Sequence, residues 1–314
     1  MNLYKTGTVA KTALNLFSEF VNVTPDKIKD FEVDILESTY KGALYHGEPY
    51  TGKAYKYDII SAYSSIMKST HMQFPIKEGV SKTLTRDEFD EMAFFKYGCY
   101  KTIIHILNPK LLRQSIDNWN THIDLNRAKE LKYKIELIEE ENNFLSYEGK
   151  LINGRKLFGG YIDYLYKFKQ DGHSCVKKYL NNLAGKLGQL NTIKLTSKDI
   201  IRADSKIVYI NRASDNLEDG EFPEIEIHKV ADASYYIYDF ARILPFLVAK
   251  GRYITSKFIE KQVDAVKYMH TDGWIMSERI DAELGSDIGD LKYEGKCKKV
   301  VIKNCTKPKE KFKL

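Results

Sequence analysis

The stretch of residues 265–276, AVKYMHTDGWIM, constrains the fold of this chain more than any other part of its sequence. It consists of an apolar run, the polar residues 270–273 and a second apolar run. An Asp-Gly pair between two such runs predicts two short strands joined by a tight turn, and therefore an antiparallel strand pair. The hairpin has two interpretations: an ordinary surface turn, or a rigid support that presents Asp272 to a metal ion. A second carboxylate from elsewhere in the chain would decide between them.

Hydrophobic periodicity along the rest of the chain predicts helices packed on one antiparallel sheet, which is the α+β fold class. Helical spacing is found at residues 8–21, 26–40, 61–69, 124–133, 158–190 and 236–251, and strand-like patterns at 54–60, 96–107, 134–139, 206–211 and 224–230. The pair Asp171-Gly172 divides the longest helical stretch in two. Pro245 is expected only at a kink of its helix, because proline lacks the amide hydrogen that a helix interior needs.

The composition is that of a soluble globular protein. The 314 residues are 43% hydrophobic and 29% charged, and no apolar run reaches the roughly 18 residues of a membrane helix. The first 17 residues lack the continuous apolar core of a secretion signal. The four cysteines lie far apart without a CxxC pair, which argues against zinc and favours a reducing compartment. We therefore expect no membrane partner and a cytoplasmic protein, in the host cytoplasm if the chain is viral.

Basic residues are concentrated near the C-terminus. From residue 292 onward there are nine lysines and only two glutamates, whereas the net charge of the whole chain is a modest +6. Such a segment is either a solvated basic tail or a surface that contacts phosphates. The 22 tyrosines allow stacking against bases, although most are expected to be ordinary half-buried strand residues.

Two further segments carry residue types suited to phosphate chemistry. Asp58 ends a predicted strand that runs directly into a helix, where a carboxylate can hold a divalent cation beside free backbone amides, or simply cap the helix. In residues 173–190, Lys177, Asn181 and Gly185 recur at i, i+4 and i+8 and so share one helix face. A lysine and an amide on one face suit a triphosphate; the alternative is a solvated face.

Together these segments resemble the polymerase motifs of family B DNA polymerases, most closely the protein-primed viral, phage and organellar-plasmid branch. The family's first motif, D-x-x-S-L-Y-P-S, corresponds to residues 58–65 (DIISAYSS), its second, K-x-x-x-N-S-x-Y-G, to 177–185 (KKYLNNLAG), and its third, Y-x-D-T-D-S, to 268–273 (YMHTDG). The family's Y-x-G-G or Y-x-G-A element appears at 40–43 (YKGA). Four motifs in the family's order, over about residues 1–305, make the resemblance specific.

The resemblance implies a two-metal nucleotidyl transfer and assigns its residues. Asp58 and Asp272 would be the catalytic carboxylates and, with the Ile59 carbonyl, would hold two Mg²⁺ or Mn²⁺ ions. The nucleotide, a dNTP, would be bound by Ser61, Tyr63, Lys177 and Asn181. Primer-template DNA would be contacted by Tyr40, Lys41, Gly42 and Lys303. Tyr63 would lie under the sugar and exclude a 2′-hydroxyl.

The resemblance also implies a domain organisation. Residues 1–50 would form an N-terminal helical segment with the Y-x-G-A element, 51–90 and 191–305 a palm, 91–190 helical fingers with an insertion, and 306–314 a basic tail. No exonuclease domain is expected before the Y-x-G-A element, and the thumb is expected to be reduced or absent. A separate exonuclease or thumb subunit, or a terminal protein, would then be a partner.

Among the positions where the sequence departs from these motifs, two bear directly on the chemistry. His270 stands where the family has the first aspartate of D-T-D, and its imidazole cannot supply a negative charge to the metal site. Ala184 stands where the family has a tyrosine beside the incoming base pair. The histidine predicts reduced activity or an altered metal preference.

Three functions remain open at this stage. The first is a template-dependent DNA polymerase core, which the Asp58–Asp272 pair and Tyr63 favour. The second is a catalytically degenerate polymerase fold that serves as a nucleic-acid-binding subunit, which His270, Ala184, Gly273 and the expected lack of a thumb favour. The third is a nucleotidyltransferase that labels a protein hydroxyl, as protein priming does, without processive synthesis.

Overall fold

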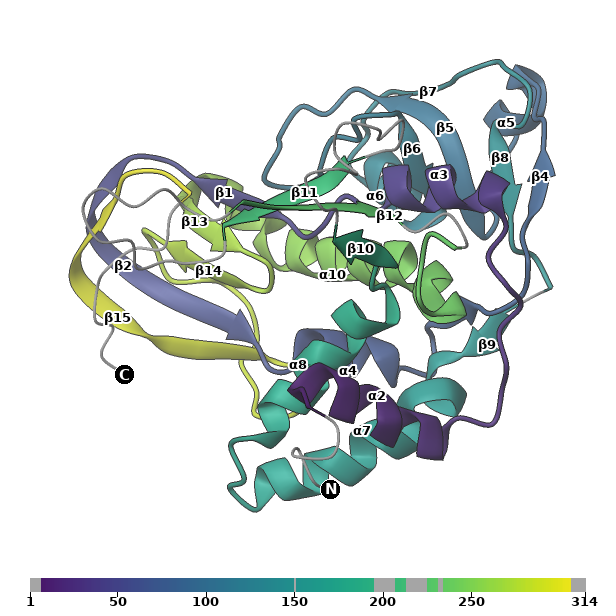
Figure 1. Ribbon diagram of the computed structural model, residues 1–314. Coiled ribbons are helices and arrows are strands. Elements are labelled where there is room, and N and C mark those ends of the chain that lie inside the picture. Colours follow the sequence, from purple (N-terminus) through teal and green to yellow (C-terminus); the bar gives the residue numbers. More distant parts are fainter. Residues whose placement is uncertain (1–6, 150, 195–206, 213–224, 231–233, 306–314) are drawn as a thin grey trace.

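The computed structural model describes residues 7–149, 151–194, 207–212, 225–230 and 234–305. It is a mixed fold of α-helices and antiparallel sheets (Figure 1). Its helices are α2 (Val9–Phe20), α3 (Asp30–Thr39), α4 (Ala62–Met67), α5 (Arg86–Asp90), α6 (His122–Glu130), α7 (Gly154–Gln170), α8 (Val176–Leu187), α10 (Ile243–Ile259) and the 3₁₀ helices η1 (Asp239–Arg242) and η2 (Glu260–Ala265).

The strands are mostly short, except for two long neighbours, β2 and β15. Their bounds are β1 (Tyr45–Gly47), β2 (Tyr50–Ile59), β3 (Gln73–Pro75), β4 (Val80–Lys82), β5 (Gly98–Ile104), β6 (Trp119–Thr121), β7 (Ile135–Leu137), β8 (Phe144–Ser146), β9 (Leu151–Asn153), β10 (Thr192–Lys194), β11 (Ile207–Arg212), β12 (Ile225–Val230), β13 (Val266–His270), β14 (Gly273–Met276) and β15 (Leu291–Ile302). The predicted 306–314 tail lies outside the described residues.

The central sheet has five strands in the order β1-β13-β14-β2-β15, with every neighbouring pair antiparallel. It brings the predicted hairpin directly beside the strand that carries Asp58, because β14 pairs with β2 and Gly273 lies opposite Asp58. β15 pairs with the other edge of β2 and places Lys292 opposite Asp58. Segments more than 200 positions apart in the sequence therefore meet at one end of the sheet.

The two faces of this sheet have different surroundings. Tyr57, Ile59 and Trp274 are buried in a hydrophobic cluster that also contains Ile259 at the end of α10, so this helix covers one face. Side chains alternate between the faces of a strand, so Asp58 projects from the opposite face. In Figure 1, β2 and β15 form a long, strongly curved two-stranded ribbon, whose far end packs back on the sheet through Val300 and Ile302 against Tyr268 and Ile275.

The predicted hairpin is present, but its turn is not the predicted Asp-Gly turn. β13 ends at His270 and β14 begins at Gly273, which leaves Thr271 and Asp272 as the turn residues. The positive φ of the turn falls on Thr271, at 64°, and not on the glycine. Gly273 is already a strand residue, and a Cβ there would lie 2.9 Å from a carboxylate oxygen of Asp58. Close packing against Asp58 therefore explains the glycine.

Helices α7 and α8 form a second part of the fold together with α2 from the N-terminal segment. Phe17 of α2 stacks on Phe158 of α7 with ring centroids 5.2 Å apart, and lies edge-on to Tyr161. These rings belong to the largest hydrophobic cluster, which also contains Leu180 and Leu183 of α8. Helix α2 is thus part of the same helical body as α7 and α8 (Figure 1).

Residues 80–146 contain a separate five-stranded sheet, with β4, β8, β5 and β6 in that order and β7 paired to β5. Helix α6 packs on it, with Leu125 and Ala128 in a third hydrophobic cluster. The predicted range 91–190 therefore contains both this sheet and the α7–α8 helix pair. The division into palm and fingers stays a prediction.

The helix predicted at 236–251 starts later than expected. α10 begins at Ile243, after the 3₁₀ helix η1, so Pro245 lies in the first helical turn. Amide hydrogens of the first turn have no partner within the helix, and a proline there needs no kink. The expected kink is therefore wrong. In the described part of the chain, no helix is both long and apolar enough to cross a membrane.

Candidate nucleotide and metal site

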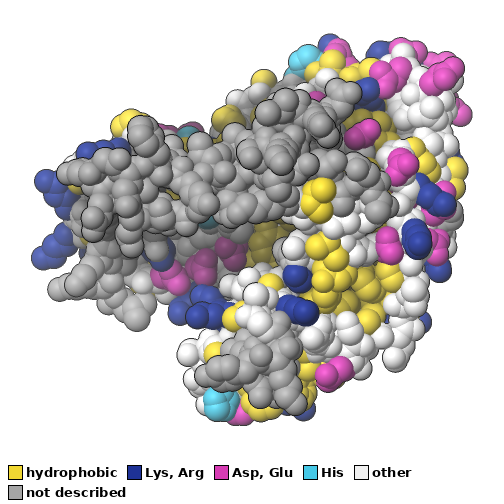
Figure 2. Space-filling view, in the orientation of Figure 1, with side chains coloured by type: hydrophobic (Ala, Val, Ile, Leu, Met, Phe, Trp, Pro, Cys, Tyr) yellow, Lys and Arg dark blue, Asp and Glu magenta, His cyan; other side chains and the backbone are white. Residues whose placement is uncertain are grey.

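A cleft of about 520 Å³ lies between the end of the central sheet and the α7–α8 helix pair. It is lined by Asp58, Ile59, Ile60, Ser61, Ala62, Tyr63, Lys169, Lys177, Asn181, His270, Thr271, Asp272, Lys292 and Glu294. In Figure 2 a group of acidic side chains lies above a group of Lys and Arg side chains at this part of the surface. The cleft thus contains all the residues predicted for metal and nucleotide binding.

The two predicted catalytic carboxylates are held by backbone contacts between their strands. Asp58 is next to last in β2, and Asp272 is in the turn between β13 and β14. The Ile59 amide donates to the Asp272 carbonyl at 3.0 Å, and the Thr271 amide donates to the Leu44 carbonyl at 3.0 Å. The turn that carries Asp272 is therefore hydrogen-bonded on one side to β2 and on the other to the residue that precedes β1.

The electrostatics of this carboxylate pair favour a bound cation. Burial, followed by the charges of Asp272 and Glu294, raises the pKa of Asp58 to about 7. Burial also raises the pKa of Asp272. Two neighbouring carboxylates with raised pKa values are typical of metal-binding sites, because a divalent cation between them would remove their mutual repulsion. Within the described residues no three His, Cys, Asp or Glu side chains form a complete ligand set, so bound phosphates would supply further ligands.

The raised pKa of Asp58 predicts a pH-dependent stability effect. The folded state holds this proton more tightly than an unfolded chain, whose aspartates titrate near about 4, so stability is lost as the pH rises from about 4 to 7. In metal-free protein, Asp58→Asn should raise the free energy of unfolding at pH 8 by roughly 1–2 kcal/mol, allowing for partial exposure, and by less at pH 5. Urea unfolding with EDTA at both pH values measures this. Exposed Asp87→Asn is the control, and an Asp58→Asn effect of equal size at both pH values would contradict the prediction.

The helix pair contributes the cationic side of the cleft. Lys177 and Asn181 project from one face of α8 and are both exposed to the cleft, as their i, i+4 spacing predicts. Lys169, in the last turn of α7, donates to the Ser61 hydroxyl at 2.5 Å and was not among the predicted residues. Burial and the nearby charges of Lys177 and Lys292 lower the pKa of Lys169. Three lysines thus face the two carboxylates, an arrangement that suits a polyanion bound through metal ions.

Two residues that flank the carboxylates have left-handed backbone conformations. Ser61 has a φ of 50° and precedes α4, and Thr271 has a φ of 64° in the hairpin turn. Positive φ is uncommon for residues other than glycine and is most unfavourable for a β-branched one. The Thr255 hydroxyl of α10 donates to the Thr271 carbonyl at 3.3 Å and helps to hold this turn. Such strain is concentrated at functional sites, where it fixes side chains in place.

His270 lies in the cleft beside Asp272, where the resemblance would place a third carboxylate. Its Nδ1 is 3.2 Å from the Thr271 hydroxyl, and its side chain is exposed. We predict that His270→Asp increases nucleotide incorporation with Mg²⁺ several-fold, or removes a preference for Mn²⁺, because it adds negative charge beside the ions. Steady-state incorporation with each metal tests this, with His270→Asn as the uncharged control. A decrease with His270→Asp would mean that the cleft is adapted to histidine.

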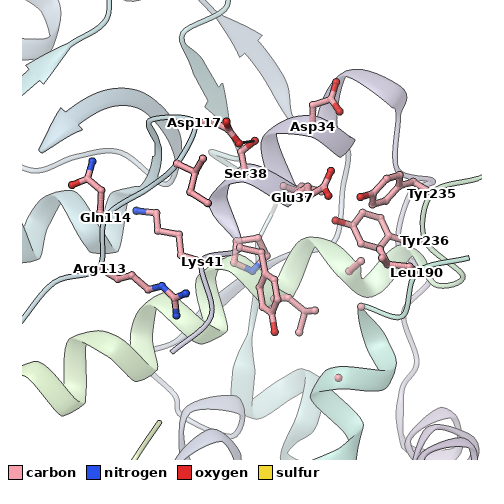
Figure 3. A pocket seen from close by; sticks show the side chains of 18 residues that line it. Asp34, Glu37, Ser38, Lys41, Arg113, Gln114, Asp117, Leu190, Tyr235 and Tyr236 are labelled. Atoms are coloured by element: carbon pink, nitrogen blue, oxygen red, sulfur yellow. Dashed lines mark hydrogen bonds between the residues drawn. The ribbon is translucent and has the colours of Figure 1, made fainter. Parts of the chain in front are cut away.

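The four predicted DNA-contacting residues lie outside this cleft. Tyr40 is 48% exposed and lines a second, larger cleft of about 830 Å³, shown in Figure 3. Gly185 and Gly188 at the end of α8 also line this cleft, together with the paired rings of Tyr235 and Tyr236. Because Lys177 and Asn181 face the first cleft, one helix connects the two.

Lys41 borders the second cleft but is directed into the protein. Its ammonium donates to Asn120 and lies 3.7 Å from Asp124, with only 3% of the side chain exposed. Burial lowers the pKa of Lys41 to about 8. Arg252 of α10 pairs with the same carboxylate at 2.9 Å and donates to the Gly42 carbonyl at 2.5 Å. In this structure the Lys41 ammonium and the Gly42 carbonyl therefore belong to an internal charge network, and the DNA contacts predicted for these residues stay predictions.

Lys303 lies just past the end of β15, outside the first cleft. β15 runs antiparallel to β2, with Leu291 opposite Ile59 and Ile302 opposite Tyr50, so Lys303 follows the end of the ribbon that points away from Asp58 along the strand. The bent ribbon returns this end to the central sheet, because a Cβ at Gly47 of β1 would lie 2.5 Å from the backbone of Asn304. Lysine-rich surface surrounds it, because the exposed residues of β15 include Lys296, Lys298 and Lys299 (Figure 2).

The residues missed by sequence reasoning are Lys169, Lys292, Glu294, Asp124 and Arg252. Lys292 and Glu294 reach the cleft through the pairing of β15 with β2, and a bulge between Tyr293 and Gly295 inserts Glu294 as an extra residue. The isolated Gly295 inside this strand, which has a φ of 133°, is the local signal that could have indicated the bulge. For Lys169 the sequence offered a weak signal, its position eight residues before Lys177. Two helical turns, or a short break between two helices, can bring residues at this spacing to the same side of the fold.

Among solved structures, phi29 DNA polymerase has a similar fold. Its complex with primer-template DNA in a post-translocation state has a TM-score of 0.67 and 16% identity over 96% of this chain and 55% of that chain. Its complex with single-stranded DNA has a TM-score of 0.65 and 15% identity over 99% of this chain and 59% of that chain. The present chain thus spans less than two thirds of its structural neighbours. No protein-family model and no curated protein sequence matches the chain.

Proposed function

We propose that this chain is the core of a template-dependent DNA polymerase, which transfers a nucleotide from a dNTP to a primer 3′-hydroxyl. The observation that carries the proposal is that Asp58 and Asp272 share one cleft with Lys177 and Asn181 in a fold similar to that of phi29 DNA polymerase. In this assignment residues 51–90 and 191–305 act as the palm, and α7 and α8 as the fingers.

The resemblance to family B DNA polymerases assigns a role to each of these side chains. Two divalent cations, held by Asp58 and Asp272 with the Ile59 carbonyl, would activate the primer hydroxyl and neutralise the triphosphate. Lys177 would pair with the triphosphate, and Asn181 would support it from the next helical turn. Ser61 would bind phosphate through its backbone and hydroxyl. Tyr63 would carry the deoxyribose on its ring.

The second cleft is the proposed path of the single-stranded template. It contains three tyrosines, Tyr40, Tyr235 and Tyr236, on which unpaired bases can stack irrespective of sequence. Gly185 leaves the helix backbone open there, because a Cβ at this position would have no neighbour within 4 Å. The neighbours of similar fold include complexes with single-stranded and primer-template DNA, which supports DNA as the partner.

Primer extension tests the proposal directly. A labelled primer-template is incubated with the four dNTPs and Mg²⁺ or Mn²⁺, with Asp58→Ala protein as the control for contaminating polymerase. Template-dependent extension by the unchanged chain, absent from the variant, is the expected result. Because the chain spans less than 60% of its structural neighbours, the test is repeated with candidate exonuclease, thumb or terminal-protein partners.

The alternative function is a nucleic-acid-binding subunit with a degenerate site. The exposed His270 in the cleft and Ala184 in α8 favour it. It predicts DNA binding without incorporation under any metal. Extension that depends on Asp58 would exclude it.

The lysines of β15 lead to a prediction about DNA affinity. Exposed Lys298 and Lys299 would contact the phosphates of the product duplex, and each such contact contributes about 0.9 to the slope of log affinity against log salt concentration. The double substitution of both lysines by alanine should lower that slope by about 2 and weaken binding equally for all sequences. Fluorescence anisotropy from 50 to 200 mM salt measures it. Lys134→Ala, at an exposed lysine of the other sheet region, should leave the slope unchanged.

A further inference from the structure

Helix α10 carries a glycine in its interior that its backbone does not require. Gly251 lies in the middle of Ile243–Ile259 and is not among the residues with positive φ. A glycine in a helix interior is destabilising relative to alanine, so a glycine there points to close packing by a neighbour.

That neighbour is the ring of Tyr63. A Cβ at residue 251 would lie 3.2 Å from Cε1 of Tyr63 and 3.5 Å from both Cζ and the hydroxyl oxygen. The ring therefore rests directly on the backbone of α10. A residual space of about 10 Å³ adjoins this contact and is lined in part by Thr255 and Asp272. This is too little for the ring to retreat into, since a single water needs about that volume.

The other side of the same ring faces the first cleft. Tyr63 lines it together with Asp58, Lys177 and Asp272. Ala62 and Ile66, beside Tyr63 in α4, are buried in the core. A shift of the ring away from α10 would therefore move it into the first cleft, where the proposed nucleotide would bind.

We infer that Gly251 is a positioning residue that sets how far the Tyr63 ring projects into the nucleotide cleft, and thereby the enzyme's fit to the deoxyribose. The inference rests on the proposed function. A methyl group at residue 251 would displace the ring by a few tenths of an ångström toward the sugar. Gly251→Ala should then raise the KM for dNTPs about tenfold and leave kcat within about threefold, because the loss is one of nucleotide binding.

The test is a double-mutant cycle with Tyr63→Val. Single-nucleotide incorporation of dATP and ATP is measured for the unchanged chain, Gly251→Ala, Tyr63→Val and the double variant. Tyr63→Val removes the ring and should admit ATP at least about tenfold better relative to dATP. Gly251→Ala should increase KM only when Tyr63 is present, so the double variant should match Tyr63→Val. Thermal melting should be unchanged or higher for Gly251→Ala, because alanine favours the helix.

The outcomes of this cycle distinguish a failure of the inference about Gly251 from a failure of the proposed function. An unchanged KM for Gly251→Ala, or an equal increase with and without Tyr63, overturns the inference while leaving the polymerase assignment intact. If Gly251→Ala melts at a lower temperature, the dATP affinity is measured at a temperature where all four proteins are folded. If the alanine lowers this affinity equally with and without Tyr63, the inference is again overturned. A complete absence of templated incorporation by the unchanged chain overturns the proposed function itself.

Discussion

Replacing either Asp58 or Asp272 by alanine is expected to abolish nucleotide incorporation, with a loss of at least about 10³-fold, while the protein remains folded. Both carboxylates face one cleft, and each would hold cations without which the primer hydroxyl and the triphosphate are not activated. Because the two act as a unit, the double variant should be barely worse than either single one. Single-turnover incorporation with Mg²⁺ and Mn²⁺ provides the measurement.

The matched control is Asp87→Ala, which removes an exposed aspartate from α5 in the other sheet region. It should retain normal incorporation. Near-normal extension by either cleft variant would show that the two-metal assignment is wrong. Additive losses in the double variant would show that Asp58 and Asp272 belong to separate sites.

The second large effect is expected at Asp124, which lies between Lys41 and Arg252 with only 1% of its side chain exposed. The two cations hold the pKa of this buried carboxyl well below its usual range. Asp124→Ala would leave both cations buried without their shared anion, and breaking a buried pair in this way costs about 3–5 kcal/mol of stability. Urea unfolding at pH 7 measures the loss.

Glu139→Ala serves as the control for that experiment, since Glu139 forms an exposed pair with Arg86 at 2.9 Å. Exposed pairs contribute about 0–1 kcal/mol, so this variant should unfold almost like the unchanged chain. Similar small losses for both variants would contradict the role of Asp124. The network also connects α6, α10 and the Gly42 carbonyl, so we expect Asp124→Ala to loosen the edge of the second cleft.

Local patterns were sufficient to predict much of the secondary structure. The hairpin around Asp272, the strand that carries Asp58 and the break between α7 and α8 were all expected, because alternation, helical spacing and turn residues act within a few positions of the chain. The one-face position of Lys177 and Asn181 follows from the same 3.6-residue period. The roles assigned to these residues came from the resemblance, and they stay predictions.

Only the tertiary structure decided which residues share the cleft and which are buried. The pairing of β14 and β15 with β2 brings Asp272, Lys292 and Glu294 to Asp58, and strand pairing over such distances leaves no local signal. Lys41 follows an exposed tyrosine in the sequence, yet it is buried, where it donates to Asn120 and forms an ion pair with a carboxylate 83 positions later (124 − 41 = 83). The interior glycine of α10 likewise has a reason only once Tyr63 lies against it. Contacts of this kind depend on the whole packed chain, whereas periodicity depends on a few neighbouring residues.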